Sequence, residues 1–262
     1  MINRNAIIEW GRTVPWVEPY YIEQDLIISR ALVAIYSDEM LSSKLAFRGG
    51  TAINKLFFET PSRYSEDLDF VQIQAEPIGE TLDRIKEALS FLGNPKTKRK
   101  MSNNVLLYAF DAEGNSGMRL HLKIEINCKE HFSVYDKVKM PFSVKNQWYT
   151  GQCNVTTYCF DELIGTKIRA LYQRRKGRDL YDIYMALESG LLSVPRTIEC
   201  YREYIAFPDN HIPTANEYLD NLAAKMQDQG FLEDIVPILP RNKVYDVDRA
   251  YNAIIENIIS FM

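Results

Sequence analysis

Apolar residues recur at helical spacing near the start of the chain and alternate with polar residues farther on. Between Tyr20 and about Leu41 they return at three- and four-residue steps, which predicts an amphipathic helix of about six turns. The run LAFRGGTAINKLFFE predicts a short strand, a tight turn and a second helix with Thr51 as its N-cap. DLDFVQI then predicts a strand, and residues 77–92 a helix ending near Gly93.

The next segments have the alternation of a half-buried sheet. NVLLYAFDA and RLHLKIEIN flank the turn sequence EGNSG and predict a hairpin. In the second segment one face is apolar, and the other carries His121, Lys123, Glu125 and Asn127. A further strand is predicted around QCNVTTY, followed by helices over 160–173 and 177–189. This shift predicts an α/β core with an N-terminal helix, residues 1–158, and a mainly helical domain, residues 159–262.

Composition narrows the class of protein. The chain has 262 residues, of which 46% are hydrophobic and 25% charged, as in ordinary globular proteins. Neither a signal peptide nor a membrane-length apolar stretch is evident, so we expect a cytoplasmic protein with no membrane partner. The four cysteines and three histidines are scattered and predict neither a zinc site nor a disulfide framework. A net charge of −4 argues against a protein that coats nucleic acid.

Two basic clusters remain as local candidates for nucleic-acid contact. They are Lys96, Lys98, Arg99 and Lys100 in NPKTKRK, and Arg174, Arg175, Lys176 and Arg178 in QRRKGRD. The simpler interpretation of either cluster is a solvated surface. A local basic groove for an RNA backbone is the alternative.

The run RYSEDLDF places carboxylates unusually close together. Asp67 and Asp69 are two apart on a predicted strand, so they share a face with Cα atoms roughly 7 Å apart. At that separation two carboxylates can share one or two divalent cations. Glu66 points to the other face. Acidic pairs at strand ends also occur without any function, so the pair needs its context.

That context is RGGT, at the end of the preceding predicted strand. Gly49, Gly50 and Thr51 would place free backbone N–H groups, a hydroxyl and a helix N-terminus at one point, which suits phosphate groups. A plain tight turn explains the glycines equally well, yet it does not account for carboxylates on the next strand. Glu125 is the candidate third carboxylate; the alternative is a surface pair with Lys123.

The second half of the chain supplies KIRALYQRRKGRDLYDI. Lys167 lies at the margin of an apolar stripe, where it could extend to solvent or reach a triphosphate as a point charge. Asp179 and Asp182 lie three apart on one helical face. They could serve the same site, or they could pair with Arg175 or Arg178 near the helix start.

FRGGTAINKL, RYSEDLDF and KIRALYQRRKGRDLYDI, in this order, resemble the AbiEii/AbiGii-type nucleotidyltransferase toxins, whose mycobacterial relatives are called MenT. The resemblance extends from near Tyr20 to about Leu187. It implies an α+β fold with a polymerase-β-like nucleotidyltransferase core, a mixed sheet with flanking helices, followed by a helical domain. It also implies Mg²⁺ as the cofactor.

The resemblance assigns roles to individual residues. It implies that Gly50 and Thr51, with Gly49 beside them, hold the triphosphate, and that Asp67 and Asp69 bind the metal. Threonine stands where the wider superfamily usually has serine after a single glycine, and it keeps the hydroxyl. The remaining assignments are Arg63 and Ser65 as nucleotide contacts, and Lys167 and Asp179 as catalytic residues. In the mechanism that fits, Lys167 with Arg63 or Lys55 would neutralise the triphosphate.

The implied reaction transfers a nucleoside monophosphate from a nucleoside triphosphate to an acceptor hydroxyl. In the best-understood relatives the acceptor is the 3′ end of tRNA, so the resemblance implies growth arrest through blocked aminoacylation. The protein would be the toxin of a bacterial toxin–antitoxin or phage-abortive-infection system, with a cognate antitoxin as partner. The two basic clusters would then contact the RNA backbone.

Other functions are also consistent with parts of the pattern. A D-x-D motif binds nucleotide diphosphates in metal-dependent glycosyltransferases, and the D-x-D-x-V of Asp67, Asp69 and Val71 formally fits a phosphoaspartate phosphatase. Neither class requires RGGT one strand upstream. A catalytically silent nucleotide- or RNA-binding module, or the neutralising partner of another toxin, is the alternative from outside the enzymes.

Overall fold

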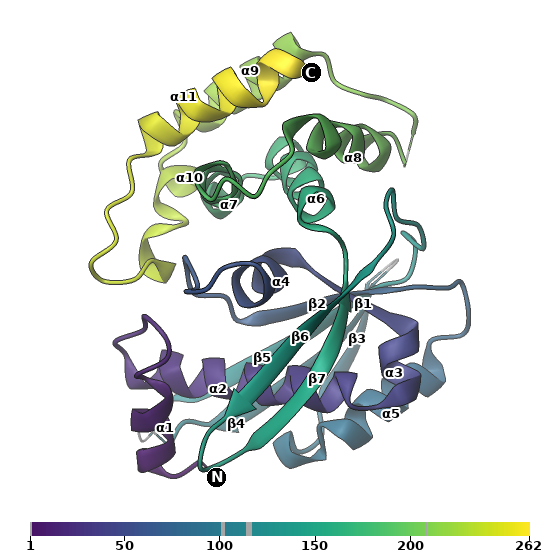
Figure 1. Ribbon diagram of the computed structural model, residues 1–262, viewed down its shortest axis with the longest axis vertical. Helices are drawn as coiled ribbons and strands as arrows, with labels where there is room; N and C mark the ends of the chain where they lie inside the picture. Colours follow the sequence, from purple (N-terminus) through teal and green to yellow (C-terminus); the bar gives the residue numbers. More distant parts are fainter. Residues whose placement is uncertain (1, 101–102, 114–116, 208) are drawn as a thin grey trace. The chain divides into compact units, whose positions relative to one another are not determined.

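The chain folds into two units of different composition, shown in Figure 1. The computed structural model describes residues 2–100, 103–113, 117–207 and 209–262. The sheet unit comprises residues 1–133 and 137–158. The helical unit comprises residues 159–262 together with the short segment 134–136.

The sheet unit contains a mixed seven-stranded sheet in the order β3-β4-β5-β2-β1-β7-β6. Its strands are β1 (Leu45–Arg48), β2 (Asp67–Gln72), β3 (Lys96–Lys100), β4 (Asn103–Asp111), β5 (Arg119–Asn127), β6 (Val138–Lys145) and β7 (Thr150–Thr157). Its helices are α1 (Arg4–Trp10), α2 (Pro19–Tyr36), α3 (Glu39–Lys44), α4 (Gly49–Leu56) and α5 (Gly79–Ala88), with a 3₁₀ turn over Ser90–Leu92.

Alternation along the central strands creates the main core on one face of this sheet. In β5 the four apolar residues are buried, and their polar neighbours are half-buried or exposed. On β2, Phe70 is buried and its ring contacts Phe47 of β1 and Tyr36 of α2. Helix α2 therefore covers the Phe70 face, whereas α4 lies on the opposite face (Figure 1). The α4 face is the one toward which Asp67 and Asp69 point.

Two predicted boundaries near the N-terminal half are wrong. The helix predicted from Tyr20 to about Leu41 is two helices, because α2 ends at Tyr36 and the Asp38 side chain accepts a hydrogen bond from the backbone N–H of Leu41 at 3.0 Å, which starts α3. Thr51 is not an N-cap. Helix α4 begins at Gly49 with Arg48 as its N-cap, so Thr51 already lies inside the first turn.

Neither edge strand is among the strands predicted from the sequence. β3 and β6 pair antiparallel with β4 and β7, at opposite ends of the sheet. The described side chains of β3 are exposed, and the segment KTKRK has no apolar alternation. β6 does alternate, with Val138, Met140, Phe142 and Val144 less exposed than the residues between them, although no strand is predicted there. Each edge strand is held by backbone pairing with the strand that follows it in the chain, so β3 needs no apolar face to join the sheet.

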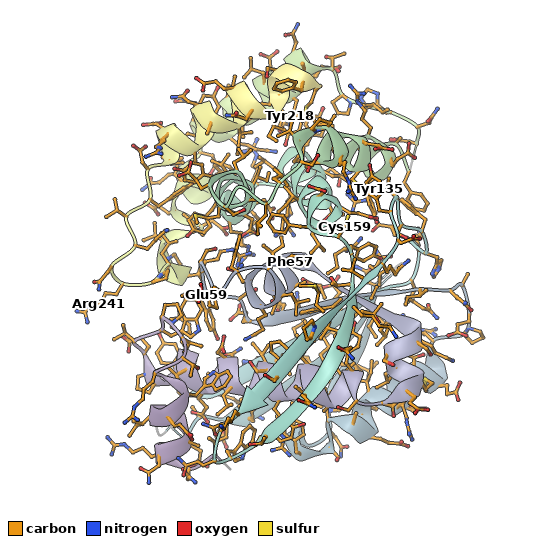
Figure 2. The ribbon with its side chains drawn as sticks, viewed as in Figure 1. Phe57, Glu59, Tyr135, Cys159, Tyr218 and Arg241 are labelled. Carbon is orange, nitrogen blue, oxygen red and sulfur yellow. The ribbon has the colours of Figure 1, made fainter. Side chains whose placement is uncertain are left out.

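The helical unit contains α6 (Phe160–Gln173), α7 (Gly177–Glu188), α8 (Val194–Ala206), α9 (Ala215–Lys225), α10 (Gln229–Glu233) and α11 (Val247–Asn257). The bounds of α6 match the predicted helix, and α7 ends one residue before the predicted end. Figure 2 labels Tyr218, which is buried and donates a hydrogen bond to the Ile168 carbonyl at 2.8 Å, joining α9 to α6. Among the described residues, no helix is long and apolar enough to cross a membrane.

The short segment 134–136 joins the helical unit through a buried carboxylate. Glu162, in the first turn of α6, is fully buried. Its carboxylate accepts hydrogen bonds from the backbone N–H groups of Val134 at 2.9 Å and Tyr135 at 3.1 Å, and from the Tyr204 hydroxyl at 2.8 Å. Three donors offset the desolvation of this charge, so Glu162 fixes the segment to α6.

Candidate active site

The turn between β1 and α4 requires both of its glycines. Gly49 has φ = +85°, and a Cβ atom there would lie 2.5 Å from Oδ2 of Asp69. A Cβ atom on Gly50 would overlap the guanidinium of Arg63. The backbone at the start of α4 therefore approaches one carboxylate and one buried cation more closely than any side chain would allow. The first backbone N–H groups of a helix have no partner within the helix, so this turn places donors beside Asp69.

Strand register assembles the carboxylates on the α4 face. Asp69 pairs with Arg48 of β1 on one side and with Glu125 of β5 on the other. Asp67 pairs with Lys123. Because directly paired residues point to the same face, Asp67, Asp69 and Glu125 form one group across two parallel strands. Asp67 and Asp69 are half-exposed, whereas Leu68 between them is fully buried.

Lys123 places a cation inside this carboxylate group. Its Nζ atom lies 2.8 Å from Oδ2 of Asp67 and 3.4 Å from Oε2 of Glu125. Partial burial would lower the pKa of Lys123, but the neighbouring carboxylates of Asp67, Asp69 and Glu125 outweigh that and raise it. Glu125 also accepts a 2.6 Å hydrogen bond from Nδ2 of Asn103. The sequence predicted Lys123 only as a possible surface partner of Glu125. It did not predict the contact between Lys123 and Asp67.

The hydroxyl groups of Thr51 and Ser65 link α4 to the start of β2. Their oxygen atoms lie 2.6 Å apart, and the Thr51 hydroxyl also donates to the backbone carbonyl of Asp67. Thr51 is 1% exposed. In this structure the two hydroxyls fix the helix start to the strand that carries the carboxylates.

The charged groups of Arg63 and Lys55 contact other residues of the sheet unit. Arg63 is buried against Gly50 and donates to the Tyr64 carbonyl at 2.9 Å. The Lys55 ammonium lies 3.0 Å from Asp25 Oδ2 and 2.9 Å from the Ser29 hydroxyl. A contact between Lys55 and a nucleotide would require the ammonium to leave that pair.

Asp25 organises a second buried polar group in the same unit. Besides Lys55, its carboxylate accepts hydrogen bonds from the indole N–H groups of Trp10 at 2.9 Å and Trp16 at 3.2 Å. Asp25 is 3% exposed. The indoles and the ammonium offset its burial, so this network attaches the N-terminal segment to α2 and α4.

Lys167 and Asp179 belong to a buried ion network of the helical unit. The Lys167 ammonium lies 2.9 Å from Asp179 Oδ1 and 2.8 Å from Asp182 Oδ2, and Arg174 makes a bidentate contact with Asp179 at 2.6 and 2.8 Å. Burial by itself would raise the pKa of Asp179. The charges and hydrogen bonds of Lys167 and Arg174 prevail and hold that pKa well below its ordinary value.

The two basic clusters differ in their surroundings. Arg174 and its neighbours in the second cluster face acidic partners within the helical unit. The further pairs are Arg175 with Asp228 at 3.1 Å, Lys176 with Asp234 at 3.2 Å and Arg178 with Asp234 at 3.7 Å. In the first cluster Lys96, Lys98 and Arg99 are exposed on β3, at the edge of the sheet. The side chain of Lys100 lies outside what the structure describes.

The donors on the α4 face fit a hard divalent cation. Mg²⁺ is usually bound by one or two carboxylates together with substrate phosphates and water. Asp67 and Asp69 supply two carboxylates of this kind. Within the described ranges no group of three or more His, Cys, Asp or Glu residues is placed to hold a metal, and the Glu125 carboxylate faces Lys123 and Asn103.

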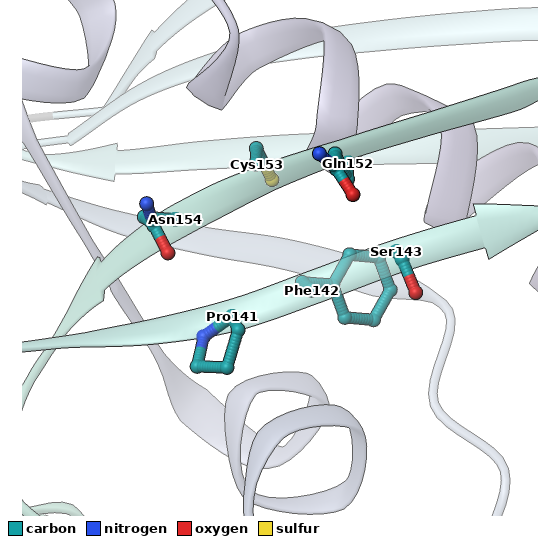
Figure 3. Close-up of a pocket in the computed structure, with 6 residues that line it drawn as sticks. All are labelled: Pro141, Phe142, Ser143, Gln152, Cys153 and Asn154. Atoms are coloured by element: carbon teal, nitrogen blue, oxygen red, sulfur yellow. The ribbon is translucent and has the colours of Figure 1, made fainter.

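A separate pocket lies on the β6–β7 hairpin of the sheet unit. Figure 3 shows its lining residues, which are Pro141, Phe142 and Ser143 of β6 and Gln152, Cys153 and Asn154 of β7. None of these six side chains is charged. Burial raises the pKa of Cys153 to about 11, so its thiol is protonated at neutral pH and is a poor nucleophile. This pocket does not supply the chemistry expected of the carboxylate pair.

Comparison with known proteins identifies the family. The family model described as "Nucleotidyl transferase AbiEii toxin, Type IV TA system" matches residues 30–253. The chain belongs to the AbiEii family. Its members are nucleotidyltransferase toxins, so the predicted reaction class is confirmed. The AbiEii assignment also implies a nucleoside triphosphate substrate and a cognate antitoxin.

Solved structures agree with the AbiEii fold. MenT4, a nucleotidyltransferase toxin from Mycobacterium tuberculosis, aligns with a TM-score of 0.58 and 14% identity over 100% of this chain and 99% of its own. JHP933 from Helicobacter pylori aligns with a TM-score of 0.56 and 16% identity over 92% of this chain and 90% of its own. These likenesses confirm the predicted α+β nucleotidyltransferase fold. No curated protein sequence matches this AbiEii member.

Proposed function

We propose that this AbiEii-family enzyme transfers a nucleoside monophosphate from a nucleoside triphosphate to the 3′ hydroxyl of a tRNA, with Mg²⁺ bound by Asp67 and Asp69. The observation that carries the proposal is the contact between the Gly49 turn and Asp69. It places the N-terminus of α4, which favours phosphate, directly beside a half-exposed carboxylate, which favours a cation. A metal–triphosphate complex needs both groups at one point.

Each residue of the site in the sheet unit would have a separate role in binding the substrate. Backbone N–H groups at Gly49 and Gly50 would hold triphosphate oxygens, while Arg63 beneath Gly50 adds positive charge to the turn. Thr51 and Ser65 would keep α4 fixed to β2, so that phosphate donors and carboxylates keep their spacing. Glu125 would complete the carboxylate group once Lys123 releases it. A divalent cation held here would offset phosphate charge and lower the pKa of the acceptor hydroxyl.

In the transfer step the acceptor oxygen attacks the α-phosphorus and forms a new phosphodiester bond. The bond from the α-phosphorus to the bridging oxygen breaks, pyrophosphate leaves, and the hydroxyl proton passes to water. Lys55 and Lys167 would add positive charge for the triphosphate only by leaving their aspartate partners. Asp179 is fully buried, so it would not contact the nucleotide itself and would hold Lys167 only while the ammonium is away from the triphosphate.

Labelling experiments test the proposal. Wild-type protein is incubated with bacterial tRNA and each nucleoside triphosphate in turn, labelled at either the α- or the γ-phosphate. We expect α-label alone to enter the tRNA, at its 3′ end. Asp67→Asn and Asp69→Asn should each lower the rate by at least about 100-fold, the range seen when a transition-state contact is lost.

Glu66→Gln is the matched control, because it removes an equal charge from the exposed residue next to Asp67. Circular dichroism checks that all three variants are folded. Undiminished labelling by both aspartate variants would contradict the metal assignment. Label in protein instead of tRNA would contradict the proposed acceptor while leaving the nucleotidyltransferase class intact.

A further inference from the structure

A row of paired residues on one face of the sheet leads from the basic edge strand to Asp67. Lys96 of β3 pairs with Leu107 of β4, Leu107 with Lys123 of β5, and Lys123 with Asp67 of β2. Directly paired residues point to the same face of a sheet. Lys96 therefore shares a face with the carboxylate, although the two are far apart in the sequence.

The next row repeats the arrangement. Lys98 pairs with Val105, Val105 with Glu125, and Glu125 with Asp69. Arg99 does not take part, since it pairs with Asn104, whose row continues to Ile126 and Phe70 on the face covered by α2. The sheet thus separates two lysines on the carboxylate side from one arginine on the other side.

Most side chains of the two rows between these ends are at least half-exposed, and Val105 is the buried exception. Lys96, Lys98 and His121 are exposed, and Lys123 and Glu125 are half-exposed. From β3 to β2 the distance is three strand spacings, about 14 Å. With one phosphate about every 3.4 Å along a stacked strand, that length accommodates about four nucleotides.

We propose that this face binds the unpaired 3′ end of the acceptor RNA, with Lys96 and Lys98 contacting phosphates about four nucleotides before the reacting hydroxyl. The proposal rests on the function proposed above, because it places that hydroxyl at Asp67 and Asp69. Lysines on an edge strand also protect sheets from pairing with other chains. Lysines on either face of the edge strand would protect it from pairing with other chains. Contact with the RNA requires lysines on the face that carries the carboxylates.

Salt-dependent binding tests the face directly. A fluorescein-labelled RNA hairpin with an unpaired 3′ extension of eight nucleotides is titrated with protein at several NaCl concentrations, and affinity is followed by anisotropy. The double variant Lys96→Gln, Lys98→Gln should reduce the slope of log K against log salt by about 1.4, at about 0.7 per contact with a single strand. The control is Lys139→Gln, Lys145→Gln, which removes two exposed lysines from β6, the opposite edge strand. Its slope should not change.

The length of the extension provides a second measurement. With an extension of six nucleotides, the β3 double variant should raise the KM for RNA about tenfold with little change in kcat, as expected for lost phosphate contacts. With an extension of two nucleotides, wild type and variant should behave alike, because the RNA does not reach β3.

The outcomes separate the two proposals. An unchanged salt slope in the β3 variant, or an equal change in the β6 control, overturns the binding face even if wild-type protein labels tRNA. Self-association of the β3 variant with unaltered RNA binding also overturns it and identifies edge protection as the role of the lysines. If wild-type protein labels no RNA but the slopes differ as expected, the proposed function fails and the binding face stands.

Discussion

Replacing Lys167 by methionine would show how strongly the helical unit depends on its buried ion network. Methionine keeps the apolar length of the side chain and removes the ammonium from between Asp179 and Asp182. The Asp179 and Asp182 side chains are 0% and 1% exposed, so water cannot take over that role without local opening. Removing one partner from a buried ion pair typically costs about 3–5 kcal/mol.

That loss is large for one unit of about 100 residues. A change of about 3 kcal/mol corresponds to a fall in Tm of about 12 °C or more at this size. Urea unfolding at pH 7, followed by circular dichroism and calorimetry, would measure it. Lys176→Met is the control, because Lys176 is 46% exposed and its pair with Asp234 should contribute less than about 1 kcal/mol.

A second substitution shows whether the stability lost in Lys167→Met comes from the unbalanced charge of the buried aspartates. Asp182→Asn in the Lys167→Met background restores electrical balance and leaves the bidentate pair of Arg174 and Asp179 in place. We expect it to recover at least half of the lost stability. A loss below about 1 kcal/mol in the single variant, or a double variant no more stable than the single, would refute the reasoning. Labelling activity that returns together with stability would assign Lys167 a structural role. Activity that stays absent in the restored double variant would show that the reaction needs the Lys167 ammonium itself.

Three further changes have defined outcomes. Gly50→Ala should displace the guanidinium of Arg63 and cost about 1–3 kcal/mol in urea unfolding; Gly79→Ala, where nothing lies within 4 Å, should cost nothing, and equal losses would contradict the close-approach argument. Lys123→Met should tighten Mn²⁺ binding to the nucleotide-free protein by about tenfold or more in an electron paramagnetic resonance titration, because the internal cation is gone; unchanged affinity would show that the ammonium does not compete with metal. The pKa of Asp179 is lowered in the folded state, so its stabilising effect is complete above its ordinary pKa of 3.8 and is lost as the pH falls through the lower folded value. The difference in unfolding free energy between wild type and Asp179→Asn should therefore narrow below about pH 4, and a constant difference down to pH 2 would contradict the ion network.

The geometry of the two short motifs RGGT and DLD could be predicted from the sequence because it is local. The spacing of Asp67 and Asp69 fixes a common face on any strand, since side chains alternate with a period of two. A Gly-Gly pair between an apolar run and a helical pattern likewise marks a tight turn at a helix start. The bounds of α6 followed from its apolar stripe for the same reason.

The partners of the charged residues could not be predicted in this way. Lys55 meets Asp25, 30 positions earlier, and Arg63 lies against Gly50. Lys167 was expected to extend to solvent or to reach a nucleotide, yet it lies between two buried aspartates. An isolated lysine or arginine in a sequence carries no sign of its partner, because ion pairs form across elements whose contact depends on the whole fold.

The sequence by itself determined the bounds of α6, the tight turn at Gly49 and Gly50, and the common face of Asp67 and Asp69, because these depend on neighbours within a few residues. Only the tertiary structure decided that the Asp69 carboxylate lies against Gly49, that Lys123 enters the carboxylate group, and that Lys96 and Lys98 face the same side as the carboxylates. The physical reason is strand register. A shift of one residue in the pairing of β2, β3 or β5 would turn the side chains of that strand to the opposite face, and the register is set by core packing along the sheet.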